Sequence, residues 1–294
     1  MLSAALAVAW VLAALVAPVL SRVHSLFSPG WSVRVLGLGA LALAVATLSS
    51  VVAAVCAMGV SVGLPVGWLW AVMSFVVALG VSRVVVHVSR MRALSRSADV
   101  FRRGVSDDHG VLLVDDPVPA AFAVPGGRGA VVATTGLRDA LSAAEFDAVL
   151  RHERAHLRHH HQVYVQMAEL AACVNPILRQ WCREVRFAAE RHADECAARA
   201  GRAVTAQALA KVALLTSATA RAAPDRLGIS DGAHAIVQRV CALRRPAPRR
   251  QRIMPLVAAV LLLVAVGADS TVTIDWMQDR LVAERAESVA DLLR

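Results

Sequence analysis

Long apolar runs without a charged residue limit what this chain can fold into more than any other feature. No charge occurs before Arg22, and the uncharged run from Val35 to Ser82 is about twice as long as one membrane helix requires. Glycine and proline between positions 59 and 67 interrupt this second run. We therefore predict three transmembrane helices, at about residues 2–20, 35–59 and 64–86.

A fourth apolar stretch, residues 253–268, is short for a span, although Arg252 can extend its side chain toward the lipid headgroups. We expect it to be a fourth transmembrane helix, followed by a short tail at 269–294. A cleavable signal peptide is the alternative for the first run, but that run lacks the early positive charge of such peptides. Residues 1–88 are thus predicted to form the first membrane part and 89–252 a soluble domain.

The distribution of charge orients these segments. The chain is 57% apolar, has a mean hydropathy of +0.56 and carries a net charge of +9, which excludes a disordered chain and an ordinary soluble domain. Residues 89–252 contain 25 Lys/Arg against 16 Asp/Glu, whereas residues 269–294 contain three Arg against six acids. The positive-inside bias therefore predicts a plasma-membrane protein with a cytoplasmic soluble domain and an external N-terminus and tail. The arginines accompany no nucleic-acid-binding motif, so we expect the anionic lipid bilayer, not nucleic acid, as their partner.

The soluble segment opens with three short β-rich pieces, at 110–115, 120–124 and 130–134, separated by proline and glycine. They predict a small sheet, and a substrate peptide could pair with the edge of the strand at 130–134. Ser142 and Glu145 form a capping-box pattern, so a helix is expected from Ser142 through His156. The predicted fold class is a mainly α membrane protein with four transmembrane helices and a cytoplasmic α+β domain.

An H-E-x-x-H pattern, made by His152, Glu153 and His156, lies on this expected helix. Histidines four residues apart project from one face, so both imidazoles can reach one zinc ion at about 2.0–2.1 Å. Glu153 lies one step round the helix, where its carboxylate can take a proton from a water molecule that attacks a peptide carbonyl. The alternative is a basic helix that carries these three residues by chance, so a third ligand is needed to decide.

Such a third ligand is available downstream, at Glu190 in the segment "FAAERHADECAARA". Asp194 falls one helical turn later on the same face, where it can accept a hydrogen bond from a ligand imidazole and fix its tautomer. An ordinary charged helix face is the alternative for this segment taken alone. Together with the upstream motif, it favours a metal-dependent peptidase site with Glu153 as the catalytic base.

A family resemblance follows from three segments, "AFAVPGGRGAVVATTGLRDALSAAEFDAVLRHERAHLRHHH", "NPILRQ" and "ERHADECAA". They resemble the BlaR/MecR-type integral-membrane zinc metallopeptidases, which place three helices before and one after a cytoplasmic protease domain. The resemblance covers the topology and nearly all of residues 90–270. It implies a gluzincin-like fold with zinc held by His152, His156 and Glu190, Glu153 as base and Asp194 behind a ligand. It also implies a cytoplasmic protein substrate such as a BlaI-type repressor.

One departure from that family concerns the signal. The antibiotic-sensing members carry a penicillin-binding domain with an S-x-x-K motif, whereas this sequence contains no S-x-x-K and its only lysine is Lys211. We expect no direct sensing through an acylated serine here, and a membrane or extracytoplasmic partner could supply the signal. Two alternatives remain: a Ste24/HtpX-like quality-control protease, which shares the motifs but usually has two helices on each side, and a non-catalytic membrane signalling scaffold with a structural metal site.

Several other features have ordinary explanations. Residues 163–178 are apolar, but a crossing there would separate Glu190 from His152, so we expect a packed helix. Residues His159–His161 are expected to be the polar end of the active-site helix rather than extra metal ligands. Tyr164 is expected to pack rather than to reach the metal. The five cysteines form no C-x-x-C pair, so neither a disulfide framework nor a thiolate zinc site is indicated.

Overall fold

The computed structural model describes residues 27–61, 66–103, 110–125, 129–221 and 229–245. This part of the chain is mostly helical and contains one small sheet. Its elements, in chain order, are α2 (Pro29–Ser61), α3 (Val66–Arg103), β1 (Val111–Val114), β2 (Ala121–Val124), β3 (Ala130–Thr134), α4 (Thr135–Ala140), α5 (Ala143–Arg158), α6 (His161–Val174), the 3-10 turn η1 (Pro176–Leu178), α7 (Arg179–Ala197), α8 (Arg202–Arg221) and α9 (Ile229–Leu243).

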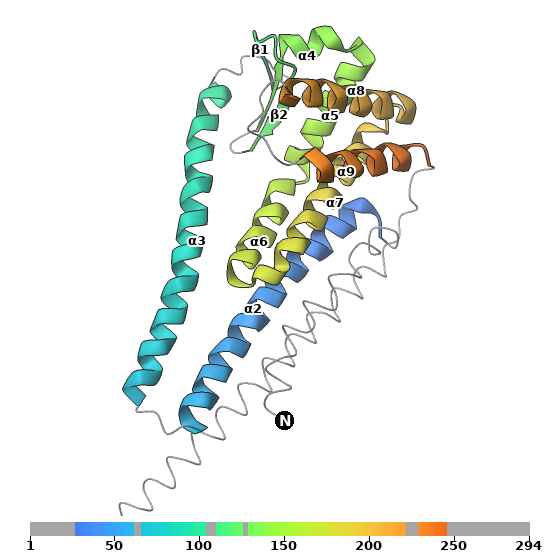
Figure 1. Ribbon diagram of the computed structural model, residues 1–294. Helices are drawn as coiled ribbons and strands as arrows, with labels where there is room; N and C mark the ends of the chain where they lie inside the picture. Colours follow the sequence, from blue (N-terminus) through green and yellow to red (C-terminus); the bar gives the residue numbers. More distant parts are fainter. Residues whose placement is uncertain (1–26, 62–65, 104–109, 126–128, 222–228, 246–294) are drawn as a thin grey trace, which may run out of the picture.

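Two long helices, α2 and α3, extend from one end of the molecule, while the sheet and the shorter helices gather at the other end (Figure 1). They run in opposite directions, as a helical hairpin requires. Helix α2 includes the predicted span at 35–59, and α3 begins at Val66, close to the predicted start at 64. Helix α3 then continues to Arg103. The basic connector at 89–103 is thus part of this helix. It contains neither glycine nor proline, the residues that most disfavour a helix.

Within the described ranges, one stretch is long and apolar enough to cross a membrane, Pro29–Ser49 of α2. By length and composition alone this is weak evidence of membrane association. The predicted spans at 2–20 and 253–268, and the tail at 269–294, lie outside the described residues. The arrangement with four transmembrane helices stays a prediction.

The three predicted strands form one sheet with the order β1-β3-β2. Strand β1 is parallel to β3, with Val111 opposite Val131, and β2 is antiparallel to β3, with Ala121 opposite Ala133. All five residues of β3 are buried because strands flank it on both sides. The expectation that a peptide pairs with the edge of residues 130–134 is therefore wrong. Strand β2 is an edge of this sheet, and it packs against α5.

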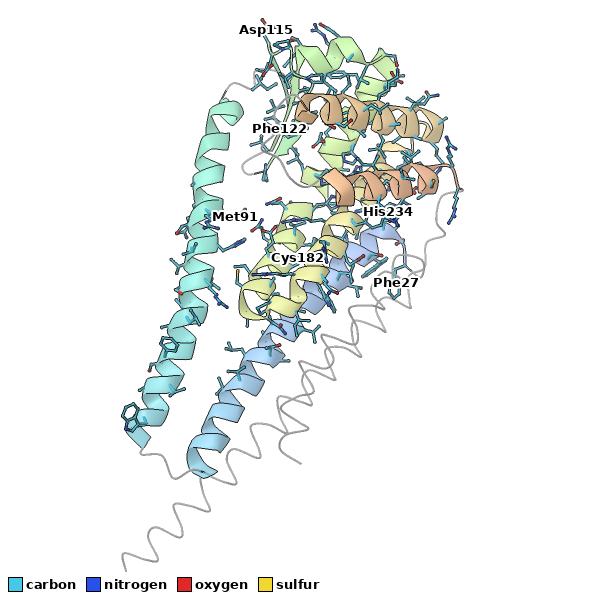
Figure 2. The ribbon with its side chains drawn as sticks, in the orientation of Figure 1. Phe27, Met91, Asp115, Phe122, Cys182 and His234 are labelled. Carbon is cyan, nitrogen blue, oxygen red and sulfur yellow. The ribbon has the colours of Figure 1, made fainter. Side chains whose placement is uncertain are left out.

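The largest hydrophobic core lies between α2, α6 and α7. Its members include Val33, Leu36, Ala40, Leu43, Ala168, Ala171, Leu178, Trp181, Cys182 and Val185. Cys182, labelled in Figure 2, donates its thiol proton to the Ala168 carbonyl at 3.2 Å. Residues 163–174 thus lie in the packed helix α6, and 176–178 form η1 after it. Tyr164 packs as expected, since a Cβ at Gly37 would lie only 3.0 Å from its side chain. This core attaches the apolar α2 to α7, the helix that carries Glu190.

Candidate metal centre

Helix α5 begins where the capping box predicts. The Ser142 hydroxyl accepts a hydrogen bond from the Glu145 amide, and the Glu145 carboxylate accepts one from the Ser142 amide at 2.9 Å. Lys211 of α8 adds an ion pair to Glu145 at 2.7 Å. With its first turn fixed in this way, the helix runs to Arg158 and carries the whole H-E-x-x-H motif.

The two histidines of the motif face each other on α5, with 3.1 Å between their Nε2 atoms. Glu190 of α7 approaches from the opposite side. Its Oε2 lies 3.3 Å from the His152 Nε2, and its Oε1 lies 3.5 Å from the His156 Nε2. The three donor atoms lie within 4.8 Å of one another, so one metal ion could bind all three. Two imidazoles and a carboxylate are a donor set that catalytic zinc uses, and they leave a coordination position open.

Asp194 lies behind this donor set, where the sequence predicted it. The His152 Nδ1 lies 3.1 Å from the Asp194 carboxylate, which turns the Nε2 of the same ring toward Glu190. Burial alone would raise the pKa of Asp194, but hydrogen bonds from Arg239 and His152 outweigh it and hold the pKa well below its usual range. Asp194 is therefore a buried anion that orients a ligand.

Arg239 of α9 is a site residue that the sequence analysis missed. Its Nε and Nη2 each donate to a different oxygen of Asp194 at 2.8 Å, and its Nη1 lies 3.0 Å from Glu190. One guanidinium thus holds both Glu190 and Asp194 of α7. Burial favours the neutral form of Glu190, but the hydrogen bond with His152 and the charge of Arg239 lower its pKa to about 2. Glu190 is consequently ionised, as a metal ligand must be.

Glu153 opens onto a cavity of about 180 Å³ beside the donor set. The apolar wall of this cavity comes from α8 and includes Ala208, Leu209 and Val212. Burial raises the pKa of Glu153 to about 7, although the charge of His152 opposes the shift. Its carboxylate also accepts a hydrogen bond from the backbone amide of Ala123 on β2. A carboxylate with a pKa near neutrality can both accept and return a proton.

A chain of histidines leads away from the other ligand, His156. The His156 Nδ1 lies 3.0 Å from the His161 Nδ1, and the His161 Nε2 lies 2.9 Å from the His192 Nδ1. When Nε2 of His156 faces a metal, its Nδ1–H donates to His161, which in turn donates to His192. His161 is 1% exposed, so the expectation that residues 159–161 are simply a polar helix end is wrong for this residue.

A second group of possible ligands lies beyond this chain of histidines. Donor atoms of His159, His192 and Cys196 lie within 4.8 Å of one another, and the Cys196 thiol is 3.6 Å from the His159 Nε2. The spacing of the cysteines could not predict this group, because its members come from two separate segments, the end of α5 and α7. Glu195 belongs to neither group of possible ligands and forms ion pairs with Arg191 and Arg202.

The motif helix, the acid from a second helix and the adjoining cavity define the class of the protein, a metallopeptidase. Comparison with protein families agrees and is more specific. The sequence model of peptidase family M48 matches residues 89–260, more than half of the chain, and the protein belongs to this family. A search of curated proteins found no match to the chain.

Proposed function

We propose that the protein is a membrane-embedded zinc endopeptidase that cleaves a cytoplasmic regulatory protein. The observation that carries the proposal is the convergence of the donor atoms of His152, His156 and Glu190 beside a cavity that Glu153 also lines. A non-catalytic scaffold needs metal ligands, but it has no use for a further carboxylate, Glu153, that faces a cavity beside them.

The residues around the cavity have separate roles in the proposed reaction. A bound zinc ion would supply a Lewis acid for the scissile carbonyl and for the attacking water. Glu153 takes a proton from that water and returns it to the leaving amine, and the Ala123 amide holds its carboxylate in place. Asp194 holds the His152 ring in position, and Arg239 keeps Glu190 and Asp194 in position and ionised.

The substrate is proposed to bind as an extended strand along the edge of β2. Glu153 is bonded to the Ala123 amide of this strand, so a peptide paired there would pass beside the catalytic carboxylate. The apolar wall of Ala208, Leu209 and Val212 offers a place for one of its side chains. The resemblance to BlaR/MecR-type proteins supports a BlaI-type transcriptional repressor as substrate and a membrane or extracytoplasmic sensor as a further partner.

The membrane placement is part of the proposal. Four spans would put the peptidase domain in the cytoplasm and both ends of the chain outside. The apolar stretch Pro29–Ser49 and the opposite directions of α2 and α3 support this arrangement. A topology reporter fused after Arg294 should be active only outside the cytoplasm, and one inserted near Gly104 only inside it. Activity of both reporters on one side would overturn the four-span arrangement.

The catalytic role of Glu153 is tested with the Glu153→Gln variant of the full chain in detergent. We expect cleavage of fluorescein-labelled casein to fall by about 10²–10⁴-fold while zinc content stays unchanged. Asp147→Asn is the matched control, because Asp147 is exposed on the same helix and pairs only with Arg151 among the described residues. If Glu153→Gln cleaves at the wild-type rate, the proposed mechanism is wrong. If the wild type binds zinc but cleaves neither casein nor a BlaI-type repressor, the scaffold alternative is correct.

A Ste24/HtpX-like quality-control protease is the second candidate, because the H-E-x-x-H and E-x-x-x-D arrangement is common to both types. The two differ in what they cut. A regulatory protease should cleave a folded BlaI-type repressor at one site, whereas a quality-control protease should prefer an unfolded membrane protein and cut it at many sites. Mass spectrometry of the products distinguishes these outcomes.

A further inference from the structure

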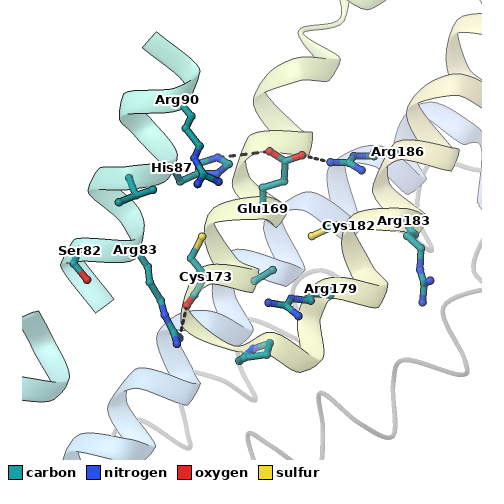
Figure 3. A pocket seen from close by; sticks show the side chains of 13 residues that line it. Ser82, Arg83, His87, Arg90, Glu169, Cys173, Arg179, Cys182, Arg183 and Arg186 are labelled. Atoms are coloured by element: carbon teal, nitrogen blue, oxygen red, sulfur yellow. Dashed lines mark hydrogen bonds and ion pairs between the residues drawn. The ribbon is translucent and has the colours of Figure 1, made fainter. Parts of the chain in front are cut away.

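A second, larger cavity lies outside the candidate metal centre, between α3 on one side and α6 and α7 on the other (Figure 3). Its volume is about 700 Å³. The residues that line it include five arginines and a single acid, Glu169. The arginines are Arg83, Arg90, Arg179, Arg183 and Arg186. They come from two helices that are far apart in the sequence, so the concentration of charge is produced by the fold.

The single acid of the cavity is already engaged. Glu169 of α6 forms an ion pair with Arg186, and its other oxygen lies 3.5 Å from the His87 Nε2 (Figure 3). Among the described residues, Arg83 makes a long contact, 3.5 Å, to the Cys173 carbonyl. The lining therefore retains an excess of positive charge for an anion. Guanidinium groups bind phosphate oxygens in pairs, so a phosphate group is the anion that such a lining fits best.

The position of the cavity along α3 indicates where that phosphate comes from. Helix α3 carries no charged residue from Val66 to Ser82, and the first charge after this stretch, Arg83, lines the cavity. Large apolar side chains of α3 are exposed on several faces before it, and those of the face that leads to the cavity recur at helical spacing, at Trp68, Val72, Phe75 and Leu79. The same three- and four-residue spacing leads on to Ser82 and Val86 in the cavity wall. An apolar stripe thus runs directly into a basic cavity.

We propose that this cavity binds the headgroup phosphate of one anionic phospholipid, whose acyl chains lie along the Trp68–Leu79 stripe. A phosphate and an apolar tail in this order match the two parts of the site. Basic cavities at the ends of membrane helices are suited to such headgroups. The inference rests on the proposed membrane location and is independent of the peptidase chemistry. Free phosphate would use the arginines but leave the stripe uncovered.

The lipid would connect α3, which includes a predicted transmembrane span, with α7, the helix of the metal centre that carries Glu190. Arg179, Arg183 and Arg186 project from the first half of α7, and Arg186 precedes Glu190 by one helical turn. Arg83 and Arg90 project from α3. One phosphate held by both sets would bridge the two helices across the cavity.

The test uses the full chain, purified in a neutral detergent and placed in lipid nanodiscs. Native mass spectrometry should show one phosphatidylglycerol retained per chain from mixed phosphatidylglycerol/phosphatidylcholine discs, and none of the neutral lipid. In the triple variant Arg83→Gln/Arg179→Gln/Arg183→Gln, the dissociation constant of short-chain phosphatidylglycerol should rise about 100-fold, because three guanidinium groups no longer attract the phosphate. The charge-matched control is Arg138→Gln/Arg151→Gln/Arg244→Gln, whose arginines lie outside the cavity, and its dissociation constant should change less than about twofold.

The remaining outcomes are also decisive. If inorganic phosphate displaces phosphatidylglycerol at equal concentration, the site binds free phosphate and the lipid proposal fails. If the wild type retains no phosphatidylglycerol, the cavity is not a lipid site. The same conclusion follows if the control variant loses phosphatidylglycerol to the same extent as the triple variant. Arg179→Glu alone, at an exposed helix position, should weaken binding at least about tenfold if the triple variant does not fold. Casein cleavage is measured in parallel, since loss of lipid with cleavage retained separates this inference from the peptidase proposal.

Discussion

Replacing Arg239 by methionine should destabilise the fold and the metal centre together. The change keeps most of the side-chain volume but removes both hydrogen bonds to Asp194 and the ion pair with Glu190. Asp194 is 1% exposed, so its charge would remain buried with His152 as its described partner. Removing one member of a buried ion pair costs about 3–5 kcal/mol of folding stability. Because Asp194 keeps its contact with His152, we expect a loss at the lower end of this range, about 3 kcal/mol. For a domain of this size, that lowers the midpoint of thermal unfolding by about 6–12 °C.

Thermal unfolding in detergent, followed by circular dichroism, measures this effect. Arg151→Met is the matched control, because Arg151 pairs with Asp147 on the exposed face of α5 and such pairs contribute less than about 1 kcal/mol. Adding Asp194→Asn to Arg239→Met should restore part of the stability, since the Asp194 charge is then no longer buried without its arginine. If Arg239→Met unfolds within about 2 °C of Arg151→Met, the buried pair does not hold the site as described.

Three further changes test other contacts. His161→Leu removes the acceptor of the His156 Nδ1–H, so the dissociation constant for zinc should rise about 10–100-fold in a competition titration; an unchanged constant would show that His161 orients nothing. Gly30→Ala puts a Cβ 2.8 Å from the His192 ring, and calorimetry should show a loss of about 1–3 kcal/mol unless the ring moves freely. The hydrogen bond from Lys211 is the main cause that lowers the Glu145 pKa to about 2. Because this folded-state pKa is depressed, its stabilisation is present above the unfolded pKa of about 4.5 and is lost as pH falls toward 2. In Lys211→Met the folding stability should therefore change less with pH over this range. The same dependence of stability on acid pH as in the wild type would refute the role of Lys211.

The sequence predicted those parts of the site that depend on local patterns. The capping box determined the start of α5, and the four-residue spacing placed His152 and His156 on one face. Glu190 and Asp194 were predicted in the same way, because they lie one helical turn apart on one face. Glu190 can then bind the metal while Asp194 contacts the ligand His152. These inferences needed only helix geometry and the chemistry of a zinc ligand set.

The contacts made by tertiary packing could not be predicted. Arg239 lies 45 residues after Asp194 on another helix, and nothing in the pattern distinguishes it from the other basic residues of the chain. His161 looks like one of three consecutive histidines, yet the left-handed backbone at His160 starts a new helix that buries it. The strand order likewise depends on a crossover that leaves β2, not β3, at the edge beside α5. Propensity identifies strands but does not order them.

X-ray absorption at the zinc edge tests the central claim most directly, because the described part of the chain offers two possible metal sites with different donors. Zinc held by His152, His156 and Glu190 has only nitrogen and oxygen neighbours, at about 2.0–2.2 Å. Zinc at the His159, His192 and Cys196 group would add a sulfur neighbour at about 2.3 Å. We predict one zinc per chain, no sulfur among its ligands, and loss of the metal in Glu190→Ala. A sulfur ligand, or zinc that survives Glu190→Ala, would contradict the assignment.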